Sequence, residues 1–118
     1  MKPLFRKNLD VIEKKVVIYG VDELAVLTFA VLLQNEIYVH FFCDPENKVT
    51  GLEIMNKPII SLDKLYGQKD EVILIVGSEN YLKQVEVLEG DGFEVFYDFN
   101  RAAYDGNSVL LMEDLKCD

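Results

Sequence analysis

The first candidate for chemistry is a turn that follows a strongly apolar run and reads Gly20-Val21-Asp22-Glu23-Leu24-Ala25. Phosphate-binding turns of dinucleotide-binding folds read G-x-G-x-x-G or G-x-G-x-x-A at this place. Gly20 provides the tight turn, and Ala25 is small enough for close packing of helix on strand. Asp22 stands where the middle glycine lets a pyrophosphate approach bare backbone. Since a carboxylate repels phosphate and can itself accept the helix N–H groups, we expect weakened phosphate affinity here.

Two further stretches belong to the same candidate site. Asp44 ends the second expected strand, where an acidic residue would hydrogen-bond ribose hydroxyls, although Asp44-Pro45 is equally a common turn start. Gly77 and Ser78 follow the fourth expected strand at the edge where such sheets bind ligands, and Ser78 fits better as a helix N-cap. The expected cofactor-binding residues are Gly20, Val21, Asp22, Glu23, Asp44, Gly77 and Ser78.

Catalytic and metal-binding residues are not expected. No pair of carboxylates suggests an acid–base couple, and no side chain resembles an activated nucleophile. Cys43 and Cys117 lack metal-ligand spacing and are interpreted as reduced thiols. His40 is the single histidine, and its place in an apolar, strand-like run favours a structural role.

The elements that must position these residues alternate between strand and helix. Apolar runs at 16–20, 37–43, 58–60, 72–77 and 93–99 predict five strands, and helices are expected over 23–34, 61–65 and 79–89. The pattern predicts an α/β fold: a three-layer Rossmann-like open parallel sheet with strand order 3-2-1-4-5. Residues 108–112 could add a further edge strand from the C-terminal tail.

The helix at 23–34 is apolar around nearly its whole circumference. A sheet covers only one side of a helix, and helices that are apolar all round are buried on several sides. We therefore expect this helix to contact a second copy of the chain or a partner domain. The alternative is that residues 1–12 or the tail cover it.

Composition predicts one domain, with a lead-in at 1–12, the Rossmann-like domain at 13–100 and an extension at 101–118. The net charge of −9 argues against nucleic-acid or anionic membrane partners. No apolar run approaches the length of a membrane span, and the N-terminus does not read as a signal peptide, so a cytoplasmic location is expected.

Residues 14–65 carry a resemblance to a known module. The stretches Lys14-Lys15-Val16-Val17-Ile18-Tyr19-Gly20, Phe41-Phe42-Cys43-Asp44-Pro45 and 51–65 together resemble the Rossmann-like nucleotide-binding domain of polysaccharide-biosynthesis nucleotide-sugar dehydratases and epimerases. The chain is also similar to the sugar-nucleotide-binding N-terminal domain of acyltransferases of the sialic-acid and pilin-glycan type. The resemblance implies a hairpin before the third strand, an acidic helix start at Glu23 and an acidic strand end at Asp44. Asp22 and Ala25 depart from the family's loop.

Two functions follow as expectations. The leading one is a non-catalytic module that binds a nucleotide or nucleotide-sugar, with NAD(P) as another conceivable cofactor. The alternative is a ligand-free scaffold or oligomerisation domain that keeps the fold and has lost the site. An NAD-dependent enzyme is disfavoured, because the phosphate loop is altered and the chain carries no catalytic constellation.

Overall fold

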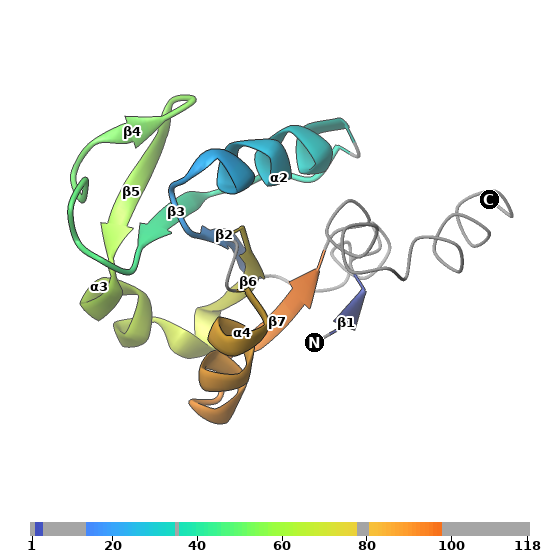
Figure 1. Cartoon of the computed structure of the whole chain (residues 1–118), viewed down its shortest axis with the longest axis vertical. Helices are drawn as coiled ribbons and strands as arrows, with labels where there is room; N and C mark the ends of the chain where they lie inside the picture. Colours follow the sequence, from blue (N-terminus) through green and yellow to red (C-terminus); the bar gives the residue numbers. More distant parts are fainter. Residues whose placement is uncertain (1, 4–13, 35, 78–80, 98–118) are drawn as a thin grey trace, which may run out of the picture.

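A computed structural model describes residues 2–3, 14–34, 36–77 and 81–97 (Figure 1). Its strands are β1 (Lys2–Pro3), β2 (Lys15–Tyr19), β3 (Phe41–Asp44), β4 (Glu53–Ile54), β5 (Lys57–Ser61), β6 (Val72–Val76) and β7 (Glu94–Tyr97). Its helices are α2 (Glu23–Gln34), α3 (Leu62–Gly67) and α4 (Tyr81–Gly90), with a 3-10 turn η1 at Lys69–Glu71. The expected α/β class is confirmed.

The centre of the sheet consists of its two most apolar strands. β2 and β6 pair in parallel from Lys15 opposite Val72 to Tyr19 opposite Val76. Every residue of β6 is buried, as is every residue of β2 except Lys15. Continuous β-branched runs of this kind suit strands covered on both faces, which explains why these two lie innermost.

The sheet contains seven strands in the order β1-β7-β6-β2-β3-β5-β4 among the described residues. All pairings are parallel except that of β4 with β5. The predicted order 3-2-1-4-5 therefore differs from the observed one. The prediction counted neither β4, which folds back on β5 as a hairpin, nor β1, and without β1 the order reads 3-4-2-1-5-6.

The two extra strands have different origins. β4 and β5 are joined by Met55 and Asn56, which both have positive φ angles (51° and 67°), as a two-residue hairpin turn requires. β1 comes from the expected lead-in and lies in parallel beside β7, so an N-terminal strand extends that edge. The C-terminal strand expected at 108–112 lies outside the described residues.

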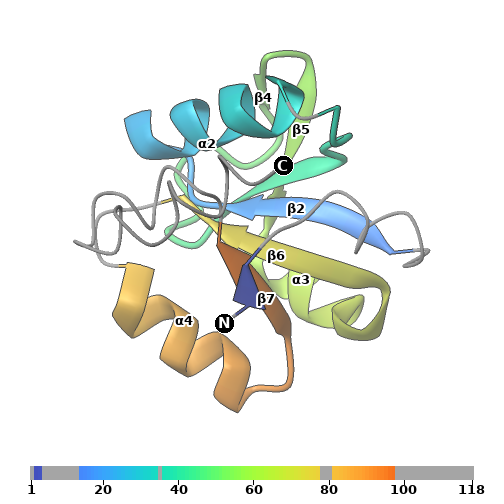
Figure 2. The same cartoon turned by 90° about the vertical axis from the view of Figure 1, so that its right-hand side faces the viewer.

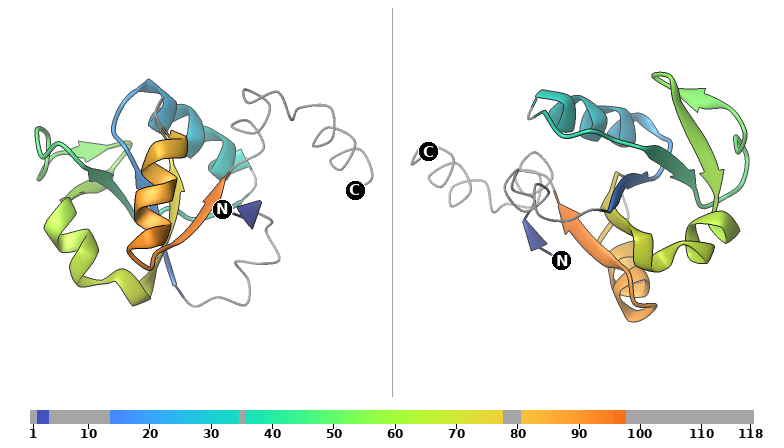
Figure 3. Two further views of the ribbon diagram at one scale, coloured as in Figure 1. Left: turned by 60° about the horizontal axis from the view of Figure 1, so that its bottom comes forward. Right: turned by 180° about the vertical axis from the view of Figure 1, so that it is seen from behind.

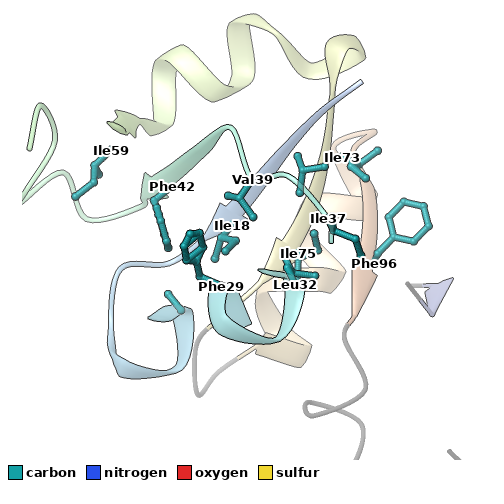
Figure 4. Close-up of a cluster of buried hydrophobic side chains, with 12 residues drawn as sticks. Ile18, Phe29, Leu32, Ile37, Val39, Phe42, Ile59, Ile73, Ile75 and Phe96 are labelled. Carbon is teal, nitrogen blue, oxygen red and sulfur yellow. The ribbon is translucent and has the colours of Figure 1, made fainter. Parts of the chain in front are cut away.

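Helices cover both faces of the sheet (Figures 2 and 3). On one face α2 packs against side chains that include Ile18, Phe42 and Ile75 (Figure 4), and the Phe29 and Phe42 ring centroids are 5.8 Å apart. On the other face α3 and α4 contribute Leu65, Val85 and Leu88 to a second cluster with the opposite side chains of the same strands. Within the described residues no helix is long and apolar enough to cross a membrane.

Helix α2 buries one of its two apolar faces. Its buried residues are Ala25, Thr28, Phe29 and Leu32, and the Thr28 hydroxyl donates to the Leu24 carbonyl at 2.8 Å. The opposite face leaves Val26, Leu27 and Leu33 exposed by 38%, 44% and 63%. The sheet thus covers one apolar face of α2, and the expected contact of its other face with a partner stays a prediction.

Candidate functional site

The expected site residues that fall in the described part of the chain gather at the carboxyl edge of the sheet. Gly20, Asp44 and Gly77 lie at or just beyond the ends of β2, β3 and β6, where Tyr19 is in register with Cys43 and Val76. The Gly20 N–H donates to the Cys43 carbonyl at 2.8 Å, and the Gly77 N–H donates to the Tyr19 carbonyl at 2.9 Å. Three strand ends are therefore tied together at one level. Ser78 lies outside the described residues.

The turn between β2 and α2 is closed by its own aspartate. Gly20 has a φ angle of 126°, which favours glycine, and Val21 and Asp22 lead directly into α2. Asp22 Oδ1 accepts a hydrogen bond from the Ala25 backbone N–H at 3.2 Å. Asp22 is thus the N-cap of α2, and its carboxylate takes a backbone donor that a bound phosphate would use. Glu23 is exposed in the first turn, where an acidic side chain is favoured by the helix dipole.

The two loops at the switch between β2 and β6 lie in close contact. A Cβ atom placed on Gly77 would be 2.7 Å from the Ala25 Cα and 3.2 Å from the Ala25 Cβ. Gly77 therefore lets the first turn of α2 rest on the end of β6. The small residue at position 25 serves helix packing, which is the role expected for it.

Asp44 is almost completely buried, with a relative exposure of 2%. Its Oδ1 accepts the Glu46 N–H at 3.0 Å, and its Oδ2 accepts the N–H groups of Lys48 at 2.6 Å and Val49 at 2.8 Å. Burial by itself raises the pKa of this carboxyl, but the backbone hydrogen bonds outweigh burial and lower it. Asp44 thus holds the loop that follows β3. This geometry accounts for the turn role, and a ribose role for Asp44 stays a prediction.

The Cys43 thiol and the Tyr19 hydroxyl are not activated as nucleophiles. Burial, followed by the neighbouring Asp44 charge, raises the pKa of the Cys43 thiol to about 12, so this thiol stays protonated at neutral pH. Burial and Cys43 also raise the pKa of Tyr19. Neither group is an activated nucleophile.

His40 lies away from the carboxyl edge and has a structural contact. The Nδ1 atom of its side chain accepts the Val16 backbone N–H at 3.0 Å, and the backbone N–H of His40 donates to the Val16 carbonyl at 2.8 Å. The side chain therefore extends the pairing of β2 with β3 at their amino ends. Within the described ranges, no group of three or more His, Cys, Asp or Glu residues is placed to hold a metal ion.

Comparison with known proteins identifies no relative of this chain. The chain matches no protein-family model, no curated protein and no solved structure. The resemblance to nucleotide-sugar enzymes stays a prediction, although the hairpin that it implies before the third strand is present as β4 and β5. The lysines and aromatic rings at the amino ends of β2, β3 and β5 had no predicted role, because they share no motif and meet only where these strands pair.

Proposed function

We propose that this chain is a non-catalytic α/β scaffold that associates with another polypeptide and binds no nucleotide at its carboxyl edge. The observation that carries the proposal is the hydrogen bond from the Ala25 N–H to the Asp22 carboxylate. A negative charge fixed at the start of α2 occupies the position where this class of turn receives phosphate. At about 4 Å, two like charges repel by roughly 1 kcal/mol even in water.

The other two elements of the candidate site support the same proposal. Both carboxylate oxygens of Asp44 already accept backbone N–H groups, so a ribose hydroxyl would have to compete with them. Gly77 and Ala25 are in contact, which leaves the two switch-point loops packed on each other. The residues that would bind a dinucleotide instead make hydrogen bonds and packing contacts within the chain.

The exposed face of α2 supports association as the remaining activity. Val26, Leu27, Ala30 and Leu33 follow helical spacing along one stripe, and none of them is charged. In a chain with a net charge of −9, an uncharged stripe is the surface on which a second copy can pack without bringing like charges together. We therefore propose a homodimer with α2 at its interface.

A thermal-shift screen tests the closed site. Wild type and Asp22→Gly are compared with NAD, NADP, UDP-sugars, ATP, AMP and coenzyme A. A ligand present at about 100 times its dissociation constant stabilises the fold by roughly 2.7 kcal/mol, which is a shift of several degrees for a domain of this size. We expect no shift in wild type. A reproducible shift of that size in wild type would overturn the ligand-free proposal.

Light scattering tests the association. Leu33→Asp places a charge on the exposed stripe of α2, and Leu82→Asp makes the same change on α4, where Leu82 is equally exposed (64% against 63%). We expect wild type and Leu82→Asp to have the mass of a dimer and Leu33→Asp to be monomeric. A monomeric wild type across the accessible concentrations would contradict dimerisation.

A second candidate is the nucleotide or nucleotide-sugar module, and one observation favours it. Gly20 keeps the positive φ angle of a phosphate-binding turn, and Gly77 remains beside it at the switch between β2 and β6. Under this alternative Asp22 weakens an existing site without removing it. A ligand shift in wild type that grows in Asp22→Gly would favour this candidate, whereas a shift confined to Asp22→Gly would favour the scaffold.

A further inference from the structure

A cluster of cations and aromatic rings lies at the amino ends of three neighbouring strands, opposite the carboxyl-edge loops. We call it the amino-edge patch and define it by five residues: Lys15, Tyr38, His40, Phe41 and Lys57. Lys15 begins β2, Phe41 begins β3 and Lys57 begins β5. These strands are adjacent and parallel, so their first residues meet at one edge (Figures 1 and 3).

The side chains of the patch form a connected row. The Lys57 Nζ lies 3.8 Å from the Tyr38 ring centroid, and the Tyr38 ring meets His40 edge-on with centroids 4.8 Å apart. The His40 and Phe41 centroids are 6.3 Å apart. At the other end of the row, the Lys15 Nζ lies 5.5 Å from the Phe41 centroid. Each lysine is thus held beside an aromatic face.

The patch presents hydrogen-bond donors and positive charge. Because His40 Nδ1 accepts the Val16 N–H, the neutral imidazole carries its proton on Nε2 and offers a donor there. Burial first, and then the charges of Lys15 and Lys57, lower the pKa of His40. The two charges that lower this pKa both belong to lysines of the patch, in a chain whose net charge is −9. Asp70 and Glu71 directly precede β6, whose first residue Val72 is in register with Lys15.

Tyr38 provides the apolar part of the same surface. It is 65% exposed although it lies between the buried residues Ile37 and Val39. Tyrosine is enriched in protein–protein contacts, and charges around such contacts orient the partner. We propose that the amino-edge patch binds an acidic segment of a partner polypeptide, with Lys15 and Lys57 meeting carboxylates and Tyr38 packing against the chain between them.

His40 makes this proposal measurable because it is the single histidine of the chain. The probe is a short synthetic peptide of alternating glutamate and leucine, added at low salt to the full chain. The NMR signal of the imidazole is followed during the titration and as a function of pH. We expect the signal to shift saturably and the pKa of His40 to rise when carboxylates dock beside it.

A matched pair of double variants separates the patch from the overall charge. Lys15→Gln with Lys57→Gln removes two charges from the patch, and Lys64→Gln with Lys83→Gln removes two from the exposed surfaces of α3 and α4. We expect the patch variant to weaken peptide binding by about tenfold, as the loss of two exposed charge pairs predicts. The control should bind nearly as wild type does, and thermal unfolding verifies that both variants are folded.

Three outcomes would overturn the proposal. The peptide leaves the His40 signal unchanged, or the control variant loses as much affinity as the patch variant does. In the third, inorganic phosphate alone produces the same saturable shift and the peptide adds nothing to it, which would make the patch a site for a small anion.

Discussion

Gly77 rests on Ala25 so closely that a Cβ atom at position 77 would lie 2.7 Å from the Ala25 Cα. This contact joins the loop after β6 to the first turn of α2. Both lie at the edge of the sheet where the sequence predicted a ligand. The backbone of α2 cannot retreat from an added methyl group without disturbing the cluster that contains Phe29 and Leu32.

We expect Gly77→Ala to destabilise the fold by about 1–3 kcal/mol, which is the usual cost of overpacking. Urea unfolding followed by circular dichroism measures the change in free energy. Gly90→Ala is the control, because a Cβ atom at Gly90 meets nothing within 4 Å and position 90 ends α4. An equal loss of stability in both variants would show that the contact with Ala25 is not the cause.

The N-cap role of Asp22 predicts different costs for two substitutions. Asp22→Ala removes the acceptor of the Ala25 N–H and should destabilise the fold by about 1 kcal/mol. Asp22→Gly should cost only a few tenths of a kcal/mol, because glycine is itself tolerated at an N-cap. Urea unfolding of the two variants gives the comparison. If Asp22→Ala unfolds at the same denaturant concentration as wild type, the carboxylate is not a cap in solution.

The lowered pKa of Asp44 predicts that the free energy of unfolding decreases at acid pH. Folding lowers the pKa of this carboxyl, so its contribution is fully present above the unfolded pKa of about 4 and is lost as the pH falls through the lower folded pKa. Asp44→Ala leaves three backbone N–H groups without their acceptor and should cost about 3 kcal/mol.

Unfolding experiments between about pH 7 and pH 3 measure both effects. Asp63→Ala, at an exposed aspartate in the first turn of α3, is the control and should change stability by less than about 1 kcal/mol. If Asp44→Ala is as stable as this control, the hydrogen bonds of the carboxylate do not hold the loop.

The sequence predicted the elements best where the hydrophobic pattern was strong. β2, β6 and α2 lie where their apolar runs predicted them, and the N-cap of α3 is Ser61, whose hydroxyl accepts the Lys64 N–H. A strand was expected from Ile37, but β3 begins only at Phe41. Buried Ile37 and Val39 alternate with exposed Tyr38 as they would in a strand, although the backbone there is not paired as one. β1 and β4 have two residues each, too few for any periodicity.

The sequence predicted the edge at which these candidate residues lie, but not the groups that they contact. Gly20, Asp44 and Gly77 lie at one edge because each follows a parallel strand, which the pattern of strands and helices alone implies. The partners of Asp44 depend on the path of the backbone from Glu46 to Val49, which no local pattern encodes. The same holds for Lys57 and Tyr38, because Lys57 begins β5 and Tyr38 precedes β3, with which β5 pairs.

The lowered pKa of His40 predicts a second dependence of stability on pH. Burial and two neighbouring lysines lower its pKa, so folding favours the neutral imidazole, and its contribution is fully present above the unfolded pKa of about 6.5. This contribution is lost as the pH falls below that value toward the folded pKa. NMR titration of the single histidine should give a pKa below 6.5 in the folded chain and near 6.5 in urea.

Two variants check the cause of the His40 shift. Lys57→Gln should raise the pKa toward its usual value without restoring it, because burial is the larger cause. Lys83→Gln removes a lysine from α4 and should leave the pKa unchanged. A folded-state pKa at or above 6.5 in wild type would contradict the acceptor role of Nδ1 toward the Val16 N–H.

We expect the Cys43 thiol to be protected from thiol reagents while the chain is folded. It is fully buried in β3, and its pKa is raised to about 12, so the reactive thiolate is scarce at pH 8. In a Cys117→Ser background, a thiol reagent such as dithionitrobenzoate should leave Cys43 unmodified in buffer and modify it fully in concentrated urea. Modification in buffer at the rate of a free cysteine would mean that β3 opens locally. Because β3 lies between β2 and β5, such opening would also expose the backbone that holds the amino-edge patch together.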